Sequence, residues 1–120
     1  MRNMSFMLTT DQIRNQTKTV TRRLGWWSLK PGDRVMACVK CQGIPKGGKI
    51  EKICEIEIVS CRAERLNQIT EDDVYREGFP QLTTLEFIRM FMKEMKCCVV
   101  ERVNRIAFKY VDRLKKEMKS

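Results

Sequence analysis

Alternating hydrophobic and polar residues over long stretches of the chain predict strands rather than helices. In residues 50–66, cysteine and isoleucine alternate with glutamate, as expected for a strand with one buried and one exposed face. Residues 103–111 alternate in the same way, with Arg105 on the polar side. Residues 34–40 are apolar nearly throughout, which favours a strand covered on both faces. The chain is therefore expected to be built mainly from strands.

Two short helices are predicted from residues that cap helix ends. Thr9 and Gln12 have the spacing of a capping box, so a helix over residues 10–16 should follow. Thr70 is a good N-cap before a run of acids, which the helix dipole favours in the first turn, and Gly78 can end that helix. The second segment is therefore a short acidic helix.

A third helix is predicted to follow Thr83, which forms a second capping box with Glu86. Apolar residues then recur at the spacing of one helical face, with two phenylalanines beside them. That face comprises Leu85, Ile88, Met92 and Met95. A methionine stripe of this kind is more typical of packing on a core than of a ligand surface.

About five or six strands and two or three short helices follow from this pattern. So few helices do not fit an alternation of strands and helices around a parallel sheet. The best fit is an α+β, mainly β domain, a small and mostly antiparallel β-barrel with short helices inserted between its strands. With 120 residues the chain is about one domain, which we place at residues 1–112, followed by a charged tail at 113–120.

The chain is strongly basic, because 24 lysines and arginines oppose 15 acids and give a net charge of +9. Such a charge attracts polyanions, so nucleic acid is the leading partner class. The longest apolar runs are only a few residues, which predicts neither a membrane span nor a signal peptide. We therefore expect a cytoplasmic protein without a membrane partner.

Histidine is absent from the sequence, which excludes every site that depends on an imidazole. Histidine triads, facial histidine-carboxylate metal sites and histidine proton shuttles are all ruled out. Among the six cysteines, Cys38 and Cys41 have the spacing of half a zinc site, but the adjacent Cys97 and Cys98 would chelate one metal poorly. The cysteines are expected to be thiols in a reducing cytosol, and no metal or cofactor is predicted.

Residues 17–23 hold the densest polar group that suits a ligand, with three hydroxyls and three cations. In an extended strand, Thr21 and Arg23 share one face, while Lys18 and Arg22 share the other. A twist or bulge at the strand end can bring Lys18 and Thr21 to one pocket mouth. This grouping suits an anionic or strongly polar ligand. An exposed edge strand kept soluble by its cations explains the same pattern without a ligand.

In four features, taken in order, the chain resembles the ASCH domains, a family of the PUA-like β-barrel superfamily. The features are Lys-Thr-Val-Thr-Arg at 18–22 after a short helix, Leu-Lys-Pro-Gly-Asp at 29–33, the acidic helix at 70–78 and the closing strand at 105–108. The resemblance implies a pseudo-barrel with a cleft that the basic segment lines. It also implies RNA binding, because the family is associated with RNA-linked processes.

Some small members of this family are similar to the chain in length and are amidohydrolases that remove the acetyl group from N4-acetylcytidine. Their catalytic lysine, threonine and glutamate correspond by motif to Lys18, Thr21 and Glu77. A lysine desolvated beside other cations can lose its proton near neutral pH and activate the threonine hydroxyl or a water. The glutamate can then pass that proton to the leaving amine. Alternatively, Lys18 and Glu77 form a plain ion pair in a cleft that binds a polar base.

The resemblance leaves three hypotheses for function. The chain binds RNA or a modified nucleoside in the basic cleft around residues 18–23; it is an N4-acetylcytidine-type amidohydrolase; or it is a ribonuclease whose cations stabilise phosphate charge. In RNA binding, the cations would hold the phosphate backbone and a tryptophan would stack on a base. The residues expected to bind are Thr19, Arg22, Arg23, Trp26, Trp27, Lys30, Lys46 and Lys49.

Overall fold

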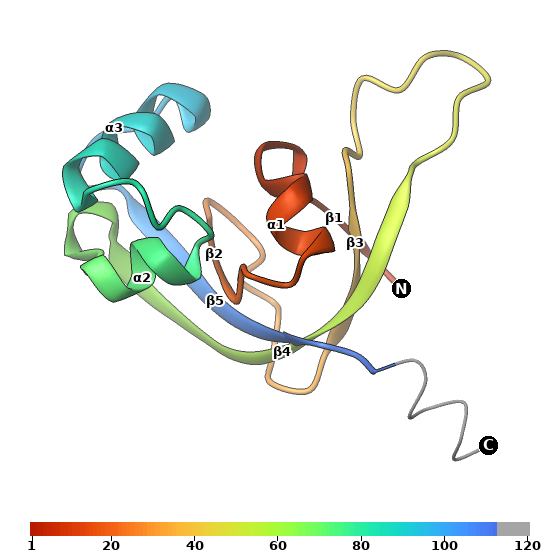
Figure 1. Cartoon of the computed structure of the whole chain (residues 1–120), viewed down its shortest axis with the longest axis horizontal. Helices are drawn as coiled ribbons and strands as arrows, with labels where there is room; N and C mark the ends of the chain where they lie inside the picture. Colours follow the sequence, from red (N-terminus) through yellow and green to blue (C-terminus); the bar gives the residue numbers. More distant parts are fainter. Residues whose placement is uncertain (113–120) are drawn as a thin grey trace.

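The computed structural model describes residues 1–112, so the charged tail predicted at 113–120 lies outside the described residues. One five-stranded sheet has the strand order β1-β3-β4-β5-β2 (Figure 1). The strands are β1 (Asn3–Ser5), β2 (Val20–Arg23), β3 (Arg34–Cys38), β4 (Lys52–Arg65) and β5 (Arg102–Tyr110). The helices are α1 (Thr10–Arg14), α2 (Glu71–Arg76), α3 (Thr84–Met95) and two single 3-10 turns, η1 (Met7–Thr9) and η2 (Leu66–Gln68).

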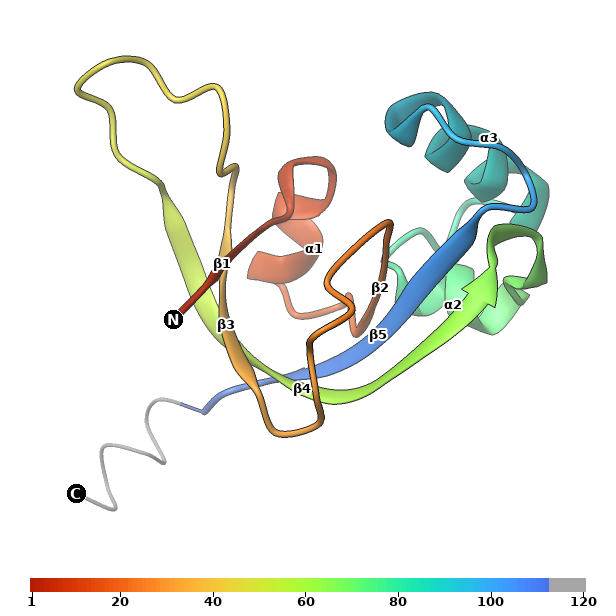
Figure 2. The ribbon, with the colours of Figure 1, turned by 180° about the vertical axis from the view of Figure 1, so that it is seen from behind.

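The long strand β4 organises the sheet, because it pairs with β3 near its start and with β5 along most of its length. Ile56 lies opposite Val35 on one side and Tyr110 on the other. The register between β4 and β5 shifts between Ile58 and Ser60, and such a bulge bends a strand and increases its twist. Both strands are strongly curved, and α1 lies within the curve of the sheet (Figures 1 and 2).

The predicted fold class is confirmed at the level of a mixed sheet with a few short helices. Three of the four strand pairings are antiparallel, and only β1 with β3 is parallel within residues 1–112. The closed barrel is not confirmed, because β1 and β2 are the two edges of the sheet. No helix in this part of the chain is long and apolar enough to cross a membrane.

Two clusters of buried apolar side chains fill the fold. The first packs α1 against the curved sheet and includes Met4, Phe6, Ile13, Leu29, Val35, Ala37, Ile56, Ile58, Ile106 and Phe108. The second packs α2 and α3 on the far ends of β4 and β5 and includes Leu66, Ile69, Val74, Phe79, Phe87, Ile88, Phe91 and Val103. Strand β2 lies beside β5 between these two regions, which places its side chains at their boundary.

The start of α1 differs from the sequence prediction. The capping box is wrong, because the Thr9 side chain caps no amide and Gln12 Nε2 donates instead to the carbonyl of Gly78, 3.2 Å away. The Thr10 hydroxyl donates to the Phe6 carbonyl at 2.9 Å. The long-range bond is preferred because it satisfies a carbonyl just beyond the end of α2, where the helix leaves acceptors unpaired.

Helices α2 and α3 begin at the predicted caps, since the Thr70 and Thr83 hydroxyls each accept a backbone amide three residues later. The buried face of α3 agrees with the predicted one only in part, because Ile88 and Met92 pack on the second cluster but Leu85 and Met95 are exposed. The face that packs on the core comprises Phe87, Ile88 and Phe91. The rings bury more apolar area than the methionines, so the helix turns them toward the second cluster.

Candidate functional site

The backbone around Lys18 is fixed by three separate elements. The chain leaves α1 through Gln16, whose φ of 61° is left-handed, and the Lys18 amide then donates to the Gln12 carbonyl at 3.3 Å. The amide of Thr19 donates to the carbonyl of the last residue of α2, Arg76, at 2.8 Å. The hydroxyl of Tyr110 on β5 donates to the Lys18 carbonyl at 2.6 Å. Residues 17–19 are therefore irregular, and the strand predicted there starts only at residue 20.

Lys18 is buried and ends on Glu77, the residue that follows the last turn of α2. Its Nζ donates to the Glu77 carboxylate at 2.7 Å and to the Glu77 backbone carbonyl at 2.8 Å. That carbonyl belongs to the helix C-terminus, where acceptors lack partners within the helix and the dipole favours a cation. Both side chains are at most 4% exposed, so the pair is shielded from solvent.

Gly78 permits this close approach of α2 to α1. Its φ of 98° is left-handed, and a Cβ built there would lie 2.7 Å from Gln12 Cγ and 3.5 Å from Lys18 Cβ. Any larger residue is therefore strained in its backbone and crowds the segment that carries Lys18.

We expect Gly78→Ala to lower the free energy of unfolding by about 1–3 kcal/mol, the cost of holding a non-glycine residue in a sparsely populated backbone region. Urea denaturation measures this loss. The matched control is Gly25→Ala, where no heavy atom lies within 4 Å of the new Cβ. Equal stability of the two variants would show that Gly78 is not required for the approach.

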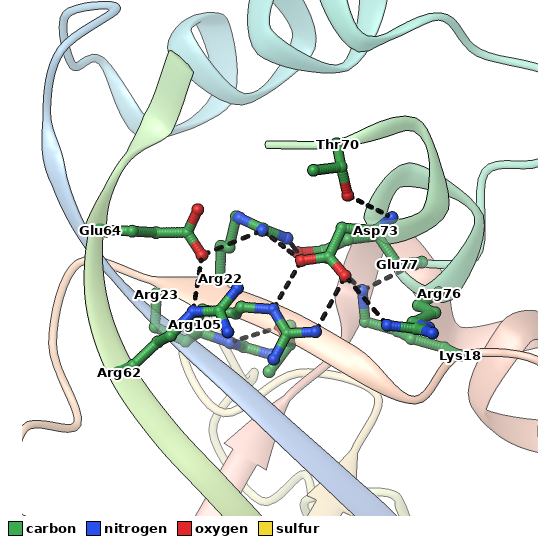
Figure 3. Close-up of polar contacts among 11 residues, drawn as sticks. Lys18, Arg22, Arg23, Arg62, Glu64, Thr70, Asp73, Arg76, Glu77 and Arg105 are labelled. Carbon is green, nitrogen blue, oxygen red and sulfur yellow. Dashed lines mark hydrogen bonds and ion pairs between the residues drawn. The ribbon is translucent and has the colours of Figure 1, made fainter. Parts of the chain in front are cut away.

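The charges around Glu77 form one buried network. Arg22 donates to Glu77 Oε2 at 3.1 Å, to Glu64 at 3.2 Å and to Asp73. Arg105 donates through two nitrogens to Asp73, at 2.6 and 2.9 Å. Figure 3 shows both guanidinium groups turned toward Asp73. The exposed side chains of Arg62 and Arg76 add longer contacts, each at 3.6 Å, to Glu64 and Asp73. With Lys18, five cations therefore meet three carboxylates, and the network keeps a net positive charge.

Burial and pairing shift the pKa values of this network. Burial lowers the pKa of Lys18, and its contact with Glu77 opposes that shift, while Arg23 and Arg22 add to it. The hydrogen bond from Arg105 holds the pKa of Asp73 well below its ordinary value. Asp73 therefore stays ionised at any ordinary pH, whereas the lysine loses its proton more readily than one in water.

A cavity of about 280 Å³ opens above this network, and we name it the Lys18 cavity. Its polar lining includes Lys18, Thr21, Arg22, Arg23 and Glu77, together with Ser5, Thr9 and Glu94. Its apolar walls come from both clusters and include Phe6, Phe79, Phe87 and Phe91. The site therefore lies where α3, η1 and β2 meet, with charged groups on one side and rings on the other.

Arg23 differs from the other cations of the Lys18 cavity. Its Nε donates to Thr21 Oγ1 at 3.1 Å, as expected for two residues on one face of a strand. Its Cζ lies 4.6 Å from the centre of the Phe6 ring. Within residues 1–112, no carboxylate lies within 4 Å of it, and burial lowers its pKa to about 10. At neutral pH it remains a cation that is available to a ligand.

The structure brings together five of the residues named from the sequence: Lys18, Thr21, Arg22, Arg23 and Glu77. It does not bring the others to the same cavity. Thr19 is exposed, and Lys30, Lys46 and Lys49 do not line this cavity. The loop that carries the last two lysines projects from the end of the sheet opposite α2 and α3 (Figure 2).

Trp26 and Trp27 line a second hollow of about 450 Å³, which we name the tryptophan hollow. It is more open than the Lys18 cavity and lies beside it, because Arg23 and Met95 form part of both walls. The two tryptophans are therefore near the first site but do not line it. The sequence places the tryptophans only a few residues after the basic strand and gives no sign that they line a separate hollow.

Sequence reasoning missed three residues of the network, Glu64, Asp73 and Arg105. Asp73 and Glu77 are four residues apart on α2, a spacing that places both carboxylates on one helical face. This spacing alone would have predicted that Asp73 lies near Glu77. Arg105 was assigned to an exposed face, but it is only 8% exposed, because α2 covers that side of β5 and supplies Asp73.

Comparisons with known proteins find structural likeness without sequence likeness. No family model and no curated protein matches the sequence. An ASCH domain from Lactobacillus crispatus JV V101 has a TM-score of 0.60 and 21% identity, over 91% of this chain and 78% of that one. Protein EF3133 from Enterococcus faecalis V583, of family DUF984, has a TM-score of 0.63 and 15% identity, over 98% and 81%.

The hypothetical protein PH0355 is also similar, with a TM-score of 0.62 and 14% identity over 92% of this chain and 96% of that one. These likenesses extend over nearly the whole chain rather than over one motif. At such low identities they show the fold alone. This chain therefore has the fold of a small ASCH-like domain, as its sequence features predicted.

Proposed function

We propose that this domain binds a nucleoside, either free or as one base of RNA, in the Lys18 cavity. The observation that carries the proposal is the joining of aromatic walls to buried polar groups within about 280 Å³. Small-molecule sites of about 300–1,000 Å³ are built in this way, with apolar walls and a few placed polar groups. The cavity has room for a base and part of its sugar but not for a duplex.

The polar groups of the cavity include both hydrogen-bond donors and acceptors, as the edge of a base requires. Lys18 and Arg23 donate hydrogen bonds, Glu77 accepts them, and the Thr21 hydroxyl can do either. Proteins read an unpaired base by hydrogen bonds along its edge and by contact of its face with aromatic rings. The ASCH-like fold supports RNA as the source of the base, and the net charge of +9 attracts a polyanion.

Calorimetric titration with cytidine tests the proposal. We expect Lys18→Met to weaken binding by about 10- to 100-fold, the effect of losing one hydrogen bond to a charged group. The control is Lys93→Met, which removes an exposed lysine of α3 that lines neither hollow. The proposal fails when cytidine binds both variants equally, or binds neither these variants nor the unaltered protein.

A second function, amidohydrolysis of an N4-acetylcytidine-type nucleoside, is favoured by the 2.7 Å contact between Lys18 Nζ and Glu77. A proton can pass between two groups this close. Lys18, once neutral, takes a proton from a water or from Thr21, and the oxygen adds to the acetyl carbonyl. The lysine passes the proton to Glu77, which delivers it to the amine as the C–N bond breaks. With water as the nucleophile, the products are acetate and cytidine. With Thr21 as the nucleophile, cytidine leaves first and a water then hydrolyses the acetyl-threonine ester to acetate.

The third function, ribonuclease activity, receives less support from the charges. A phosphate in the Lys18 cavity would meet Arg22 and Lys18 only in competition with the carboxylates that already hold them. Stabilising a developing phosphate charge requires cations that are free to face it. Arg23 alone among the polar residues of this cavity meets that requirement within residues 1–112.

A further inference from the structure

The tryptophan hollow adjoins the Lys18 cavity, but within residues 1–112 the arginines around it are not paired with carboxylates as Lys18 and Arg22 are. Arg2 lies with its Cζ 5.0 Å from the centre of the Trp26 ring, and Arg102 lies 4.2 Å from that of Trp27. Within residues 1–112, neither arginine has a carboxylate within 4 Å, and the same holds for Arg23 between the two hollows. Three unneutralised cations therefore surround two indole rings.

The backbone at this hollow is held in a strained conformation. Trp26 has a φ of 64°, a left-handed value that a bulky residue rarely adopts. The buried side chain of Asn104 on β5 donates to the carbonyls of Gly25 and Trp26, at 3.4 and 3.1 Å. The Leu29 amide donates to the same Trp26 carbonyl at 3.1 Å. The fold therefore uses several hydrogen bonds to hold this turn, which is common where a site must be preorganised.

The result of that turn is an exposed aromatic surface. Trp27 is 46% exposed although it is one of only two tryptophans in the chain. The guanidinium of Arg102 lies over its ring, so the side chain is oriented even though it is not buried. An oriented, exposed ring beside free arginines is the arrangement that binds successive bases of a single strand.

We propose that the tryptophan hollow is the subsite for the nucleotide next to the base held in the Lys18 cavity, so that the ligand is single-stranded RNA rather than a free nucleoside. The neighbouring base stacks on Trp27. The phosphate that links the two nucleotides lies against Arg23, which forms part of both walls. Arg2 and Arg102 face the next phosphates along the strand. This inference rests on the proposed function for the occupant of the first cavity.

RNA fits these groups better than a protein segment does. A protein partner would require either acidic residues or an apolar surface matched to the hollow, and neither explains why cations and rings alternate around it. A single RNA strand carries one phosphate and one base per nucleotide, so its phosphates can meet the arginines while its bases meet the rings. The adjoining base-sized cavity then gives the strand a fixed register, which an electrostatic surface alone does not provide.

A heptamer of cytidylate labelled with a fluorophore is the probe, and its anisotropy measures binding. We expect Trp27→Ala to weaken heptamer binding by about 5- to 150-fold, the range for loss of one base-aromatic stack. We expect Arg102→Gln to lower the slope of log affinity against log salt by about 0.7 for each phosphate that the protein no longer neutralises. The matched control is Arg89→Gln, which removes an exposed arginine of α3 outside both hollows.

Four outcomes separate this inference from the proposed function. The subsite is supported if Trp27→Ala binds the heptamer more weakly than the unaltered protein and Arg89→Gln binds it equally well. Equal heptamer affinity in Trp27→Ala and the unaltered protein overturns the subsite, even where cytidine binding still depends on Lys18. Heptamer binding that depends on Trp27 but not on Lys18 overturns the proposed function alone. Absence of heptamer binding overturns the subsite and leaves the hollow to a different class of partner.

Discussion

Replacing Asp73 with asparagine should lower the free energy of unfolding by about 3–5 kcal/mol, the cost of leaving a buried charge without its partner. The carboxylate accepts hydrogen bonds from two of the three guanidinium nitrogens of Arg105 and from one of Arg22. Arg22 keeps Glu64 and Glu77 as partners, but Arg105 has no other carboxylate within 4 Å in the described part of the chain. The loss is therefore dominated by the unpaired guanidinium of Arg105.

Urea denaturation of Asp73→Asn measures this loss, with Asp72→Asn as the control because Asp72 is the exposed acid beside it on α2. The control should stay within about 0.5 kcal/mol of the unaltered protein. The double variant Asp73→Asn with Arg105→Gln should be less destabilised than the sum of its single variants, because both partners of one contact are removed. A loss below about 1 kcal/mol in Asp73→Asn would show that the ion pair is dispensable.

Asp73 also predicts how stability depends on pH. The hydrogen bond from Arg105 lowers its pKa in the folded state, whereas an unfolded aspartate titrates at about 3.9. A lowered folded pKa gives stabilisation that is complete above the unfolded value and is lost as the pH falls toward the folded value. The unaltered protein should therefore lose more stability below about pH 4 than Asp73→Asn does.

Lys18→Met should reduce turnover of N4-acetylcytidine by about 100- to 10,000-fold, the usual contribution of a positioned proton-transfer group. The loss follows because no other amine of the described chain lines the cavity. Glu77→Gln should cause a loss of similar size, since glutamine keeps the shape of the side chain but cannot carry the proton. Glu77 also remains paired with Arg22 in Lys18→Met, so that variant should stay folded.

Separation of cytidine from its acetylated form measures this turnover, and circular dichroism verifies that each variant is folded. In the unaltered protein, kcat/KM should rise with pH through the lowered pKa of Lys18, because only the neutral amine accepts a proton. Full turnover in either variant would exclude the Lys18–Glu77 pair from the chemistry. Absence of turnover in the unaltered protein, together with cytidine binding, would leave the cavity as a binding site only.

Much of the fold could be predicted from local pattern. The alternation in residues 50–66 predicted β4, with Ile56 and Ile58 buried, and the caps at Thr70 and Thr83 marked two helix starts correctly. Local pattern failed where a distant contact competes with it. Gln12 bonds to Gly78 instead of capping its own helix, because the close approach of α2 offers it an unpaired carbonyl.

The candidate site was predicted only in part, and there is a physical reason why some of its residues could be predicted and others could not. Lys18, Thr21 and Arg23 are close in the sequence, so one strand end could place them together. Glu77 came only from the resemblance to ASCH domains, since it lies 59 residues beyond Lys18. The three lysines predicted to bind belong to turns and loops whose direction is set by the packing of β3 and β4 rather than by their own residues.

The sequence by itself therefore determined the strands β3, β4 and β5, two helix starts, the absence of histidine chemistry and the concentration of cations in residues 17–23. Only the tertiary structure decided which of those cations are neutralised. Arg22 meets Asp73 and Glu77 across a long stretch of intervening chain, whereas Arg23, one position later, meets no carboxylate within residues 1–112. Adjacent residues of a strand point to opposite faces, so their partners depend on what the fold packs against each face.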